Sequence, residues 1–206
     1  MRTLPMAIAL VAAVIVAGAS HATDIQVSGK KLLIKNPPSG PASNKLVFLA
    51  KSAGVIAPNG LFRDPTVYGG YLHVSGQGGD FIIGLPVGGW TANTSLSTYR
   101  YKDTSGATCK IVLIKNGALE KAVCKGSQVA YDLGVAQGPV NVILSTGTAP
   151  DPLRHCHQFD AASPESCDVV KDGSDDKKYL AKNCAGATVG CPSPSGAFLD
   201  ASGVVF

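Results

Sequence analysis

The fold is decided by residues 108–125, TCKIVLIKNGALEKAVCK, in which two runs of β-type residues flank Asn116-Gly117. Asn-Gly is the strongest short signal for a two-residue type I′ hairpin turn, because both turn positions need positive φ. With the turn at these residues, Cys109 and Cys124 face each other across the hairpin. Their Cα atoms would lie about 5.5 Å apart or slightly less, which a disulfide accepts. The stretch therefore predicts a β-hairpin that is closed by a Cys109–Cys124 disulfide.

Short β-type segments interrupted by Gly, Pro and Asn surround this hairpin, and no helical period of useful length is present. Charged residues make up only 16% of the chain and there are 24 glycines, which favours a β-rich fold with tight turns. Segments of this length and spacing are typical of a sandwich or a barrel. We predict an all-β antiparallel sandwich, with jelly-roll and immunoglobulin-like topologies both open. The further expected strands are residues 30–36, 44–51, 70–76, 80–86, 97–103, 127–134 and 138–147.

The amino terminus has the pattern of a signal peptide over residues 1–22. Met1-Arg2 precedes an apolar run, LPMAIALVAAVIVAG, which is followed by the small residues of ASHA. The apolar run is shorter than the roughly 20 residues of a membrane span, which disfavours an uncleaved anchor helix. We therefore expect cleavage near Ala22 and a mature chain, without a membrane span, that is secreted or lies in the periplasm or at the cell surface.

The chain changes character near residue 147, where a linker-like stretch begins. We expect a sandwich domain over residues 23–147 and a small disulfide-rich appendage over residues 148–206, which contains four of the six cysteines. Six cysteines in an exported chain predict three disulfides. A short hairpin of Val169-Val170 against Tyr179-Leu180 would place Cys167 beside Cys184 and leave Cys156 for Cys191. The two other pairings of these four cysteines stay open.

His155-Cys156-His157 is the one place where metal chemistry comes into question. The chain has no C-x-x-C-H haem motif, and its cysteine intervals do not match a structural zinc site. On a strand His155 and His157 would share a face and could give two ligands to copper or zinc. The favoured interpretation is a disulfide cysteine between two solvent-facing histidines, which leaves the histidines as weak metal candidates and predicts no cofactor.

A cluster of aromatic residues among glycines gives a possible ligand site. Tyr71, Trp90 and Tyr99 could stack sugars on a sheet face, although aromatic residues of sandwiches more often lie in the core. The glycines do not spell a nucleotide-binding motif, and neither G-x-S-x-G nor H-E-x-x-H occurs. We therefore expect that the protein is not an enzyme.

The net charge is +4, and the lysines are scattered along the sequence, which predicts no nucleic-acid partner. Our first hypothesis is an exported, non-catalytic structural or interaction module of the cell exterior. It could bind itself or other surface proteins by adding a terminal segment, residues 31–35 or 202–206, to a neighbour's sheet edge. The alternatives are a carbohydrate-binding module that uses the aromatic cluster, and a metal-binding protein or enzyme that uses His155 and His157.

Overall fold

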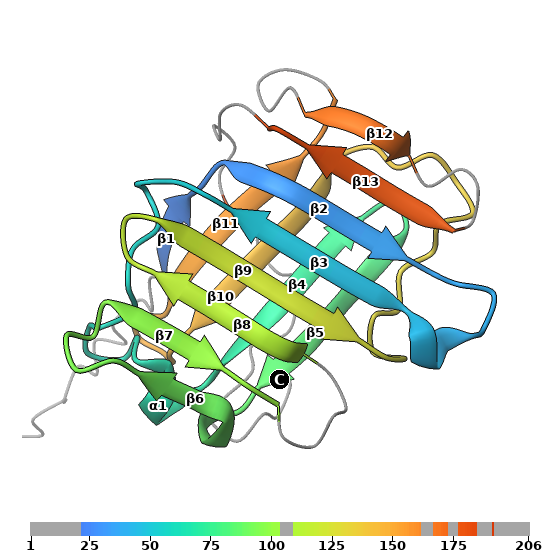
Figure 1. Cartoon of the computed structure of the whole chain (residues 1–206). Coiled ribbons are helices and arrows are strands. Elements are labelled where there is room, and N and C mark those ends of the chain that lie inside the picture. The colour runs from blue at the N-terminus through green and yellow to red at the C-terminus, as the bar shows by residue number, and fades with distance from the viewer. Residues whose placement is uncertain (1–21, 104–108, 162–166, 173–176, 185–190, 192–206) are drawn as a thin grey trace, which may run out of the picture.

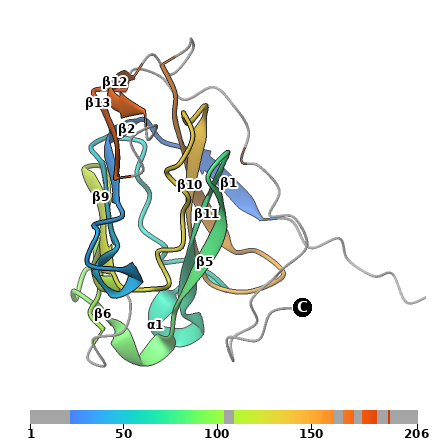
Figure 2. The ribbon, with the colours of Figure 1, turned by 90° about the vertical axis from the view of Figure 1, so that its right-hand side faces the viewer.

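The computed structural model describes residues 22–103, 109–161, 167–172, 177–184 and 191 (Figure 1). In these parts the chain forms two β-sheets that pack face to face, as the edge-on view shows (Figure 2). The strands of the front sheet cross those of the rear sheet at a steep angle (Figure 1). The predicted all-β sandwich is therefore confirmed.

The smaller sheet has five strands in the order β1-β11-β10-β4-β5, and its one parallel pair is β1 with β11. These strands are β1 (Thr23–Gln26), β4 (Gly70–Gly76), β5 (Gly79–Leu85), β10 (Val140–Thr146) and β11 (Leu153–Phe159).

The larger sheet has eight strands in the order β12-β13-β2-β3-β9-β8-β7-β6, and all its pairs are antiparallel. These strands are β2 (Gly29–Lys35), β3 (Lys45–Ala50), β6 (Trp90–Ala92), β7 (Thr98–Tyr101), β8 (Cys109–Lys115), β9 (Leu119–Lys125), β12 (Asp168–Asp172) and β13 (Lys178–Lys182). Short helices lie in the connections: η1 (Pro41–Ser43), α1 (Pro65–Tyr68) and η2 (Val87–Gly89).

Alternate residues of each sheet fill the space between the two layers. On β2 and β3 the buried Leu32, Ile34, Leu46 and Phe48 alternate with residues that face outward. This period of two is what a strand gives when one of its faces is buried. The buried residues of both sheets form one hydrophobic cluster, so each sheet keeps an outer face that takes no part in it.

The predicted hairpin is present as β8 and β9, but its turn is one residue longer than expected. Lys115 pairs with Leu119, which leaves the three residues from Asn116 to Ala118 in the loop. Gly117 has a positive φ of 63° and Asn116 does not, whereas a type I′ turn needs both. The prediction of a two-residue type I′ turn is therefore wrong.

Neighbouring segments explain the longer turn. The Asn116 side chain accepts a hydrogen bond from the backbone of Ala57, and the Gly117 amide donates to the carbonyl of Val55. Further along the hairpin, a bulge between Cys109 and Ile111 shifts the register back by one residue. Cys109 therefore faces Cys124 in spite of the different turn, with Cα atoms 3.8 Å apart.

The expected boundary at residue 147 does not separate two layers of structure. β11 lies between β1 and β10 in the smaller sheet, and β12 and β13 extend the larger sheet beyond β2. Leu153 and Phe159 of β11 are fully buried, so this strand is part of the sandwich. The polar residues between them made a buried strand difficult to predict from the sequence. The described part of the cysteine-rich segment is thus built into the two sheets.

Residues 127–134, which we expected to form a strand, are irregular. Val129, Tyr131 and Leu133 are buried with the spacing of a strand. Side chains take the place of a ladder partner, however: Asn44 donates to the carbonyl of Val129, and Asn36 donates to that of Tyr131. The apolar alternation therefore marks a segment that packs into the core without pairing.

Two expectations concern the ends of the chain. Residues 31–35 were a candidate for pairing with a neighbouring molecule, but they belong to β2, which lies between β13 and β3, so that expectation is wrong. The other candidate, residues 202–206, and the expected signal peptide up to residue 21 lie outside the described residues. Within the described part of the chain, no helix is long and apolar enough to span a membrane.

Candidate functional site

The two histidines beside Cys156 point into the sandwich. His155 is 1% exposed and His157 is 2% exposed, so the expectation that they face solvent is wrong. The predicted shared face is correct, since the residues are two apart on β11, but that face is the inner one. β11 lies inside the smaller sheet, so its inward side chains reach the core.

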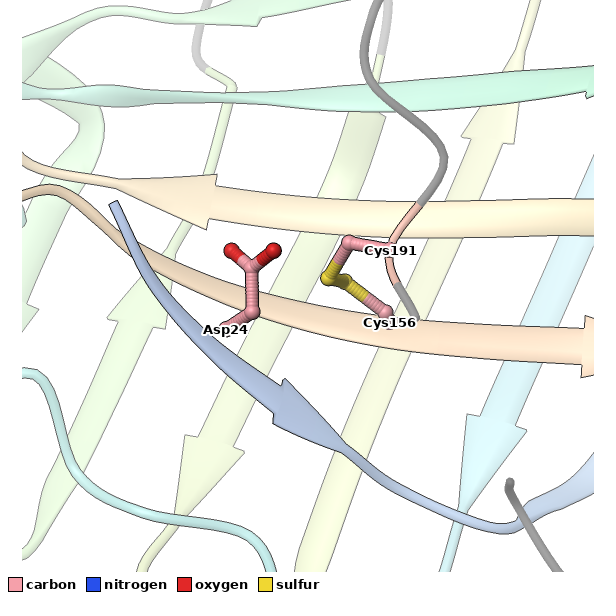
Figure 3. Close-up of side chains that lie close together, drawn as sticks. All are labelled: Asp24, Cys156 and Cys191. Carbon is pink, nitrogen blue, oxygen red and sulfur yellow. A yellow bond between two sulfur atoms is a disulfide. The ribbon is translucent and has the colours of Figure 1, made fainter. Parts of the chain in front are cut away.

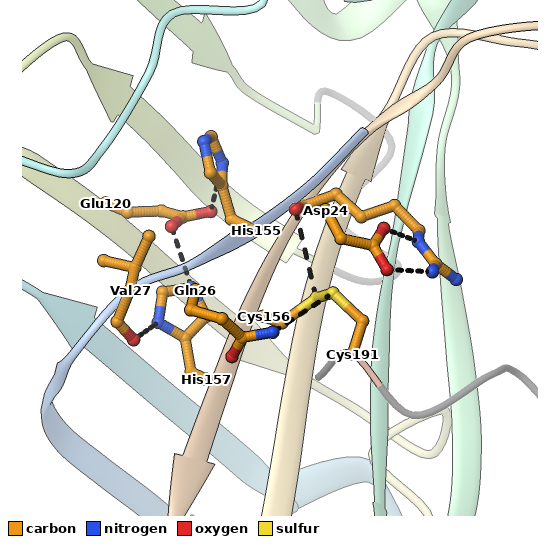
Figure 4. Close-up of a disulfide and its surroundings, with 9 residues drawn as sticks. Asp24, Gln26, Val27, Glu120, His155, Cys156, His157 and Cys191 are labelled. Atoms are coloured by element: carbon orange, nitrogen blue, oxygen red, sulfur yellow. Dashed lines mark hydrogen bonds and ion pairs between the residues drawn. A yellow bond between two sulfur atoms is a disulfide. The ribbon is translucent and has the colours of Figure 1, made fainter. Parts of the chain in front are cut away.

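A glutamate from the opposite sheet meets both histidines between the layers (Figure 4). Glu120, on β9, is fully buried. Its Oε2 lies 2.9 Å from Nε2 of His157, and its Oε1 lies 3.3 Å from Nδ1 of His155. We call these three residues the Glu120 cluster. The sequence analysis did not predict a role for Glu120. The alternation along residues 119–125 places this glutamate among the inward-facing residues of the strand, which could have marked it as a buried charge.

The partners of the Glu120 cluster fix where its protons lie. His157 Nδ1 lies 2.9 Å from the carbonyl of Val27, which can only accept, so this nitrogen donates. The backbone amide of Ile56 donates to Nε2 of His155, so the proton of a neutral His155 is on Nδ1, facing Glu120. The remaining proton lies between His157 and Glu120. Nδ1 of His155 and Nε2 of His157 thus both face the Glu120 carboxyl group.

The histidines keep the buried carboxyl of Glu120 ionised. Desolvation by itself raises the pKa of Glu120, but the charges of the two histidines and their hydrogen bonds outweigh it and lower the pKa to about 2. A buried charge is tolerated in this way only when it is paired. The ring of Phe48 packs on His157 with centroids 4.5 Å apart, which encloses the cluster further.

The disulfide pairs in the structure are the three that we expected: Cys109–Cys124, Cys156–Cys191 and Cys167–Cys184. Three bonds hold different parts of the sandwich. The first closes the β8–β9 hairpin, the second fixes residue 191 on the outer side of β11, and the third joins the ends of β12 and β13.

A group of potential metal ligands lies beside the second disulfide (Figure 3). Asp24, Cys156 and Cys191 have ligand atoms within 4.8 Å of one another. Both sulfur atoms are bonded to each other, so neither is a thiolate, and the Asp24 carboxylate accepts two hydrogen bonds, of 2.6 and 2.5 Å, from Arg154. The geometry is that of a disulfide next to an ion pair, and it does not fit a metal centre.

The aromatic residues proposed for sugar stacking are buried. Tyr71 is 8% exposed, Trp90 5% and Tyr99 0%. Trp90 donates its indole N–H to the carbonyl of Leu85 and packs against Tyr101, with ring centroids 5.4 Å apart. Trp90 and Tyr99 therefore belong to the hydrophobic core, and Tyr71 is buried as well, so the three rings offer no open stacking surface.

The outer face of the eight-stranded sheet gathers most of the lysines, which are scattered along the sequence. On β13, β2, β3, β9, β8 and β7, every residue of which is described, the sole acidic residue is Glu120, and it points inward. Lysine and arginine occupy outward positions on each of these strands. The signal was available in the sequence as lysines that alternate with core residues, but the pairing of the strands was needed to bring them together.

The register arranges this outer face in three rows that run across the strands. A first row of lysines and a third row of cations and leucines enclose a second row that is entirely apolar. The first row is Lys178, Lys35, Lys45 and Lys125; the second is Leu180, Leu33, Val47, Val123 and Ile111; the third is Lys182, Lys31, Leu49, Lys121, Leu113 and Arg100. We call these three rows the lysine face.

A cleft of about 260 Å³ opens at one end of the first row. Lys35, Pro37, Pro38, Lys177 and Lys178 line it. Three of its five lining residues are lysines, so the cleft continues the positive charge of the first row at the edge of the sheet.

Comparison of the chain with known protein families, with curated proteins and with solved structures finds no match.

Proposed function

We propose that this protein is an exported, non-catalytic interaction module that attaches to anionic material of the cell exterior through the lysine face. The observation that carries the proposal is the gathering of cations on the outer face of the larger sheet. The larger sheet presents rows of cations without an outward acidic residue on the six strands from β13 to β7. Such a surface attracts anions and increases the rate of their association.

Export is the part of the proposal that rests on the cysteines and on the amino-terminal pattern. All cysteines are paired, as is usual in an oxidising compartment. Residues 1–22 carry the composition of a signal peptide. The lysine face would then meet whatever polymers and surfaces the cell exposes outside its membrane.

The non-catalytic part rests on the burial of the histidines on either side of Cys156. Glu120, His155 and His157 lie between the sheets and contact each other, the carbonyl of Val27 and the amide of Ile56. A general acid or base must reach its substrate. The Glu120 cluster is better suited to joining the two sheets than to chemistry.

The experiment is a comparison of surfaces that differ only in charge. The mature chain, residues 23–206, is passed over anionic, neutral and cationic polymer layers on a biosensor. We expect retention on the anionic layers alone, with affinity that falls as salt rises. Equal retention on neutral layers, or none on any anionic layer, would contradict the proposal.

A further inference from the structure

We infer that the ligand of the lysine face is a linear acidic polysaccharide, which lies along the second row with its acidic groups directed to the first and third rows. The inference rests on the proposed function and specifies its ligand class. It starts from the spacing of the rows. Adjacent strands lie about 4.8 Å apart, so the first row offers an ammonium group at each such step across β2, β3 and β9.

The apolar second row supplies a surface for apolar contacts, which a row of charges alone does not provide. Leu33, Val47 and Val123 are half-buried and lie side by side on neighbouring strands. The first and third rows lie on either side, about 13 Å apart along the strands. A pyranose ring has apolar C–H faces and an equatorial rim of polar groups. A chain of such rings fits an aliphatic strip between two cationic borders.

A phospholipid surface fits this face less well. Membrane-binding surfaces insert large apolar side chains below the headgroups. On the lysine face the apolar side chains are flush with the sheet, and the described large apolar residues that are exposed lie elsewhere: Ile56, Leu61, Val67, Leu96, Val135 and Val170. Lysine stems also cover apolar surface beside them, which keeps the second row shallow.

Nucleic acid also fits this face less well. Single strands are held by aromatic rings on which the bases stack, and the outward positions of the three rows contain no aromatic residue. Base recognition and bidentate phosphate contacts favour arginine, whereas the cations here are lysines apart from Arg100. Lysine is a point charge that suits singly charged carboxylates and sulfates equally.

The cleft at the end of the first row gives the polymer a place to end or to bend. Lys35 belongs both to the first row and to the cleft wall, so the two surfaces are continuous. A volume of about 260 Å³ can take one acidic sugar unit beside three lysines. The inference therefore includes a preferred position for one unit of the chain at Lys35, where the first row meets the cleft.

The test measures binding of the mature chain to four probes at physiological ionic strength. The probes are polygalacturonate, its fully methyl-esterified form, vesicles that contain anionic phospholipid, and single-stranded polythymidylate. We expect saturable binding to polygalacturonate, none to the ester, and at least about tenfold weaker binding to vesicles and polythymidylate. A sulfated polysaccharide that binds like polygalacturonate supports the same class.

Paired variants locate the binding surface. Lys35→Glu with Lys45→Glu reverses two facing lysines of the first row, and we expect it to lower the affinity for polygalacturonate by about tenfold or more. Lys51→Glu with Lys115→Glu makes the same charge change at exposed lysines that lie about 20 Å along the strands from the first row, more than two Debye lengths. This pair should lower the affinity far less than the first-row pair does. Circular dichroism and thermal unfolding check that all variants fold, and Lys35→Gln with Lys45→Gln gives a milder version.

Each outcome supports or overturns a distinct claim. Tighter binding to vesicles or to polythymidylate, with dependence on Lys35 and Lys45, would overturn the polysaccharide inference and leave the proposed function standing. Equal loss of affinity in the two charge-reversal pairs would overturn the assignment to the first row. Binding to none of the three anionic probes would overturn the proposed function as well.

Discussion

The Glu120 cluster and the lysine face use charged residues in opposite ways. The Glu120 cluster is enclosed between the sheets, and each of its charges has a partner within the fold. The lysine face is open, and Lys35, Lys45 and Lys125 are exposed beside other cations. Paired and buried charges fix a structure, whereas open charges of one sign repel each other and gain when an anion binds. The contrast predicts that changes in the cluster alter stability and that changes on the face alter binding.

Removing the charge of Glu120 should have the largest effect on stability. Glu120→Gln leaves the shape of the side chain but takes away the counter-charge of two buried histidines. Breaking a buried ion pair on one side costs about 3–5 kcal/mol. Denaturant unfolding at neutral pH with the disulfides intact gives the free energy of unfolding. Asp168→Asn, at an exposed edge position, is the control and should stay within about 0.5 kcal/mol of the wild type. A loss below about 1 kcal/mol in Glu120→Gln would show that the cluster does not join the sheets.

The second disulfide should be next in size. Cys156→Ala with Cys191→Ala removes a cross-link that spans 35 residues, and the chain-entropy relation gives a loss of about 3 to 4 kcal/mol. The same unfolding experiment measures it. Cys109→Ala with Cys124→Ala, which spans 15 residues, should lose about 3 kcal/mol on the same relation. An unchanged free energy of unfolding in Cys156→Ala with Cys191→Ala would mean that the link between β11 and residue 191 does not stabilise the fold.

The pH dependence of stability tests the ionisation of the Glu120 cluster. The folded pKa of Glu120 is about 2, below the value of about 4.3 for a free glutamate, so its stabilising contribution is present above the free value. As pH falls through the folded pKa, that contribution is lost. The difference in unfolding free energy between wild type and Glu120→Gln should therefore narrow by roughly 3 kcal/mol between pH 6 and pH 2. A difference that stays constant over this range would contradict an ionised, buried Glu120.

Charge reversal on the lysine face should have the smallest effect on stability. Lys35→Glu with Lys45→Glu replaces two exposed lysines that face each other by two glutamates, so these two positions still repel each other. Each glutamate gains an opposite charge on its other side, from Lys178 or Lys125, which offsets that repulsion. We expect the free energy of unfolding to stay within about 0.5 kcal/mol of the wild type. A loss above about 2 kcal/mol would mean that these lysines hold the fold, and the contrast between the two regions would fail.

Local signals in the sequence were enough for the hairpin and for the sandwich. The spacing of Cys109, Asn116-Gly117 and Cys124 lies within one supersecondary unit, so the facing of the cysteines could be predicted. The turn itself could not, because Ala57 and Val55, far away in the sequence, hold Asn116 and Gly117. The bulge that compensates for the extra turn residue leaves the cysteines in place, and a prediction based on simple counting reached the right pair through a wrong register.

Which residues form the Glu120 cluster and the lysine face depends on which strands become neighbours. His155 and His157 form a patch of polar residues in the sequence, and their burial follows from the place of β11 between β1 and β10. Glu120 reaches them from the opposite sheet. In the same way Lys125 is distant in sequence from Lys35 and Lys45, and the three lysines become a row only through the pairing of β2, β3 and β9. Alternation predicts which residues face outward, but not which of them stand side by side.

The protection of individual lysines from acetylation shows where a bound polymer lies on the larger sheet. The mature chain is acetylated briefly with and without saturating polygalacturonate, and mass spectrometry measures the protection of each lysine. We expect the strongest protection at Lys35, Lys45 and Lys125 and little at Lys51 and Lys115, while the fold stays intact. Uniform protection of all exposed lysines, or stronger protection of Lys51 and Lys115 than of the first row, would contradict the claim that the lysine face is the binding surface.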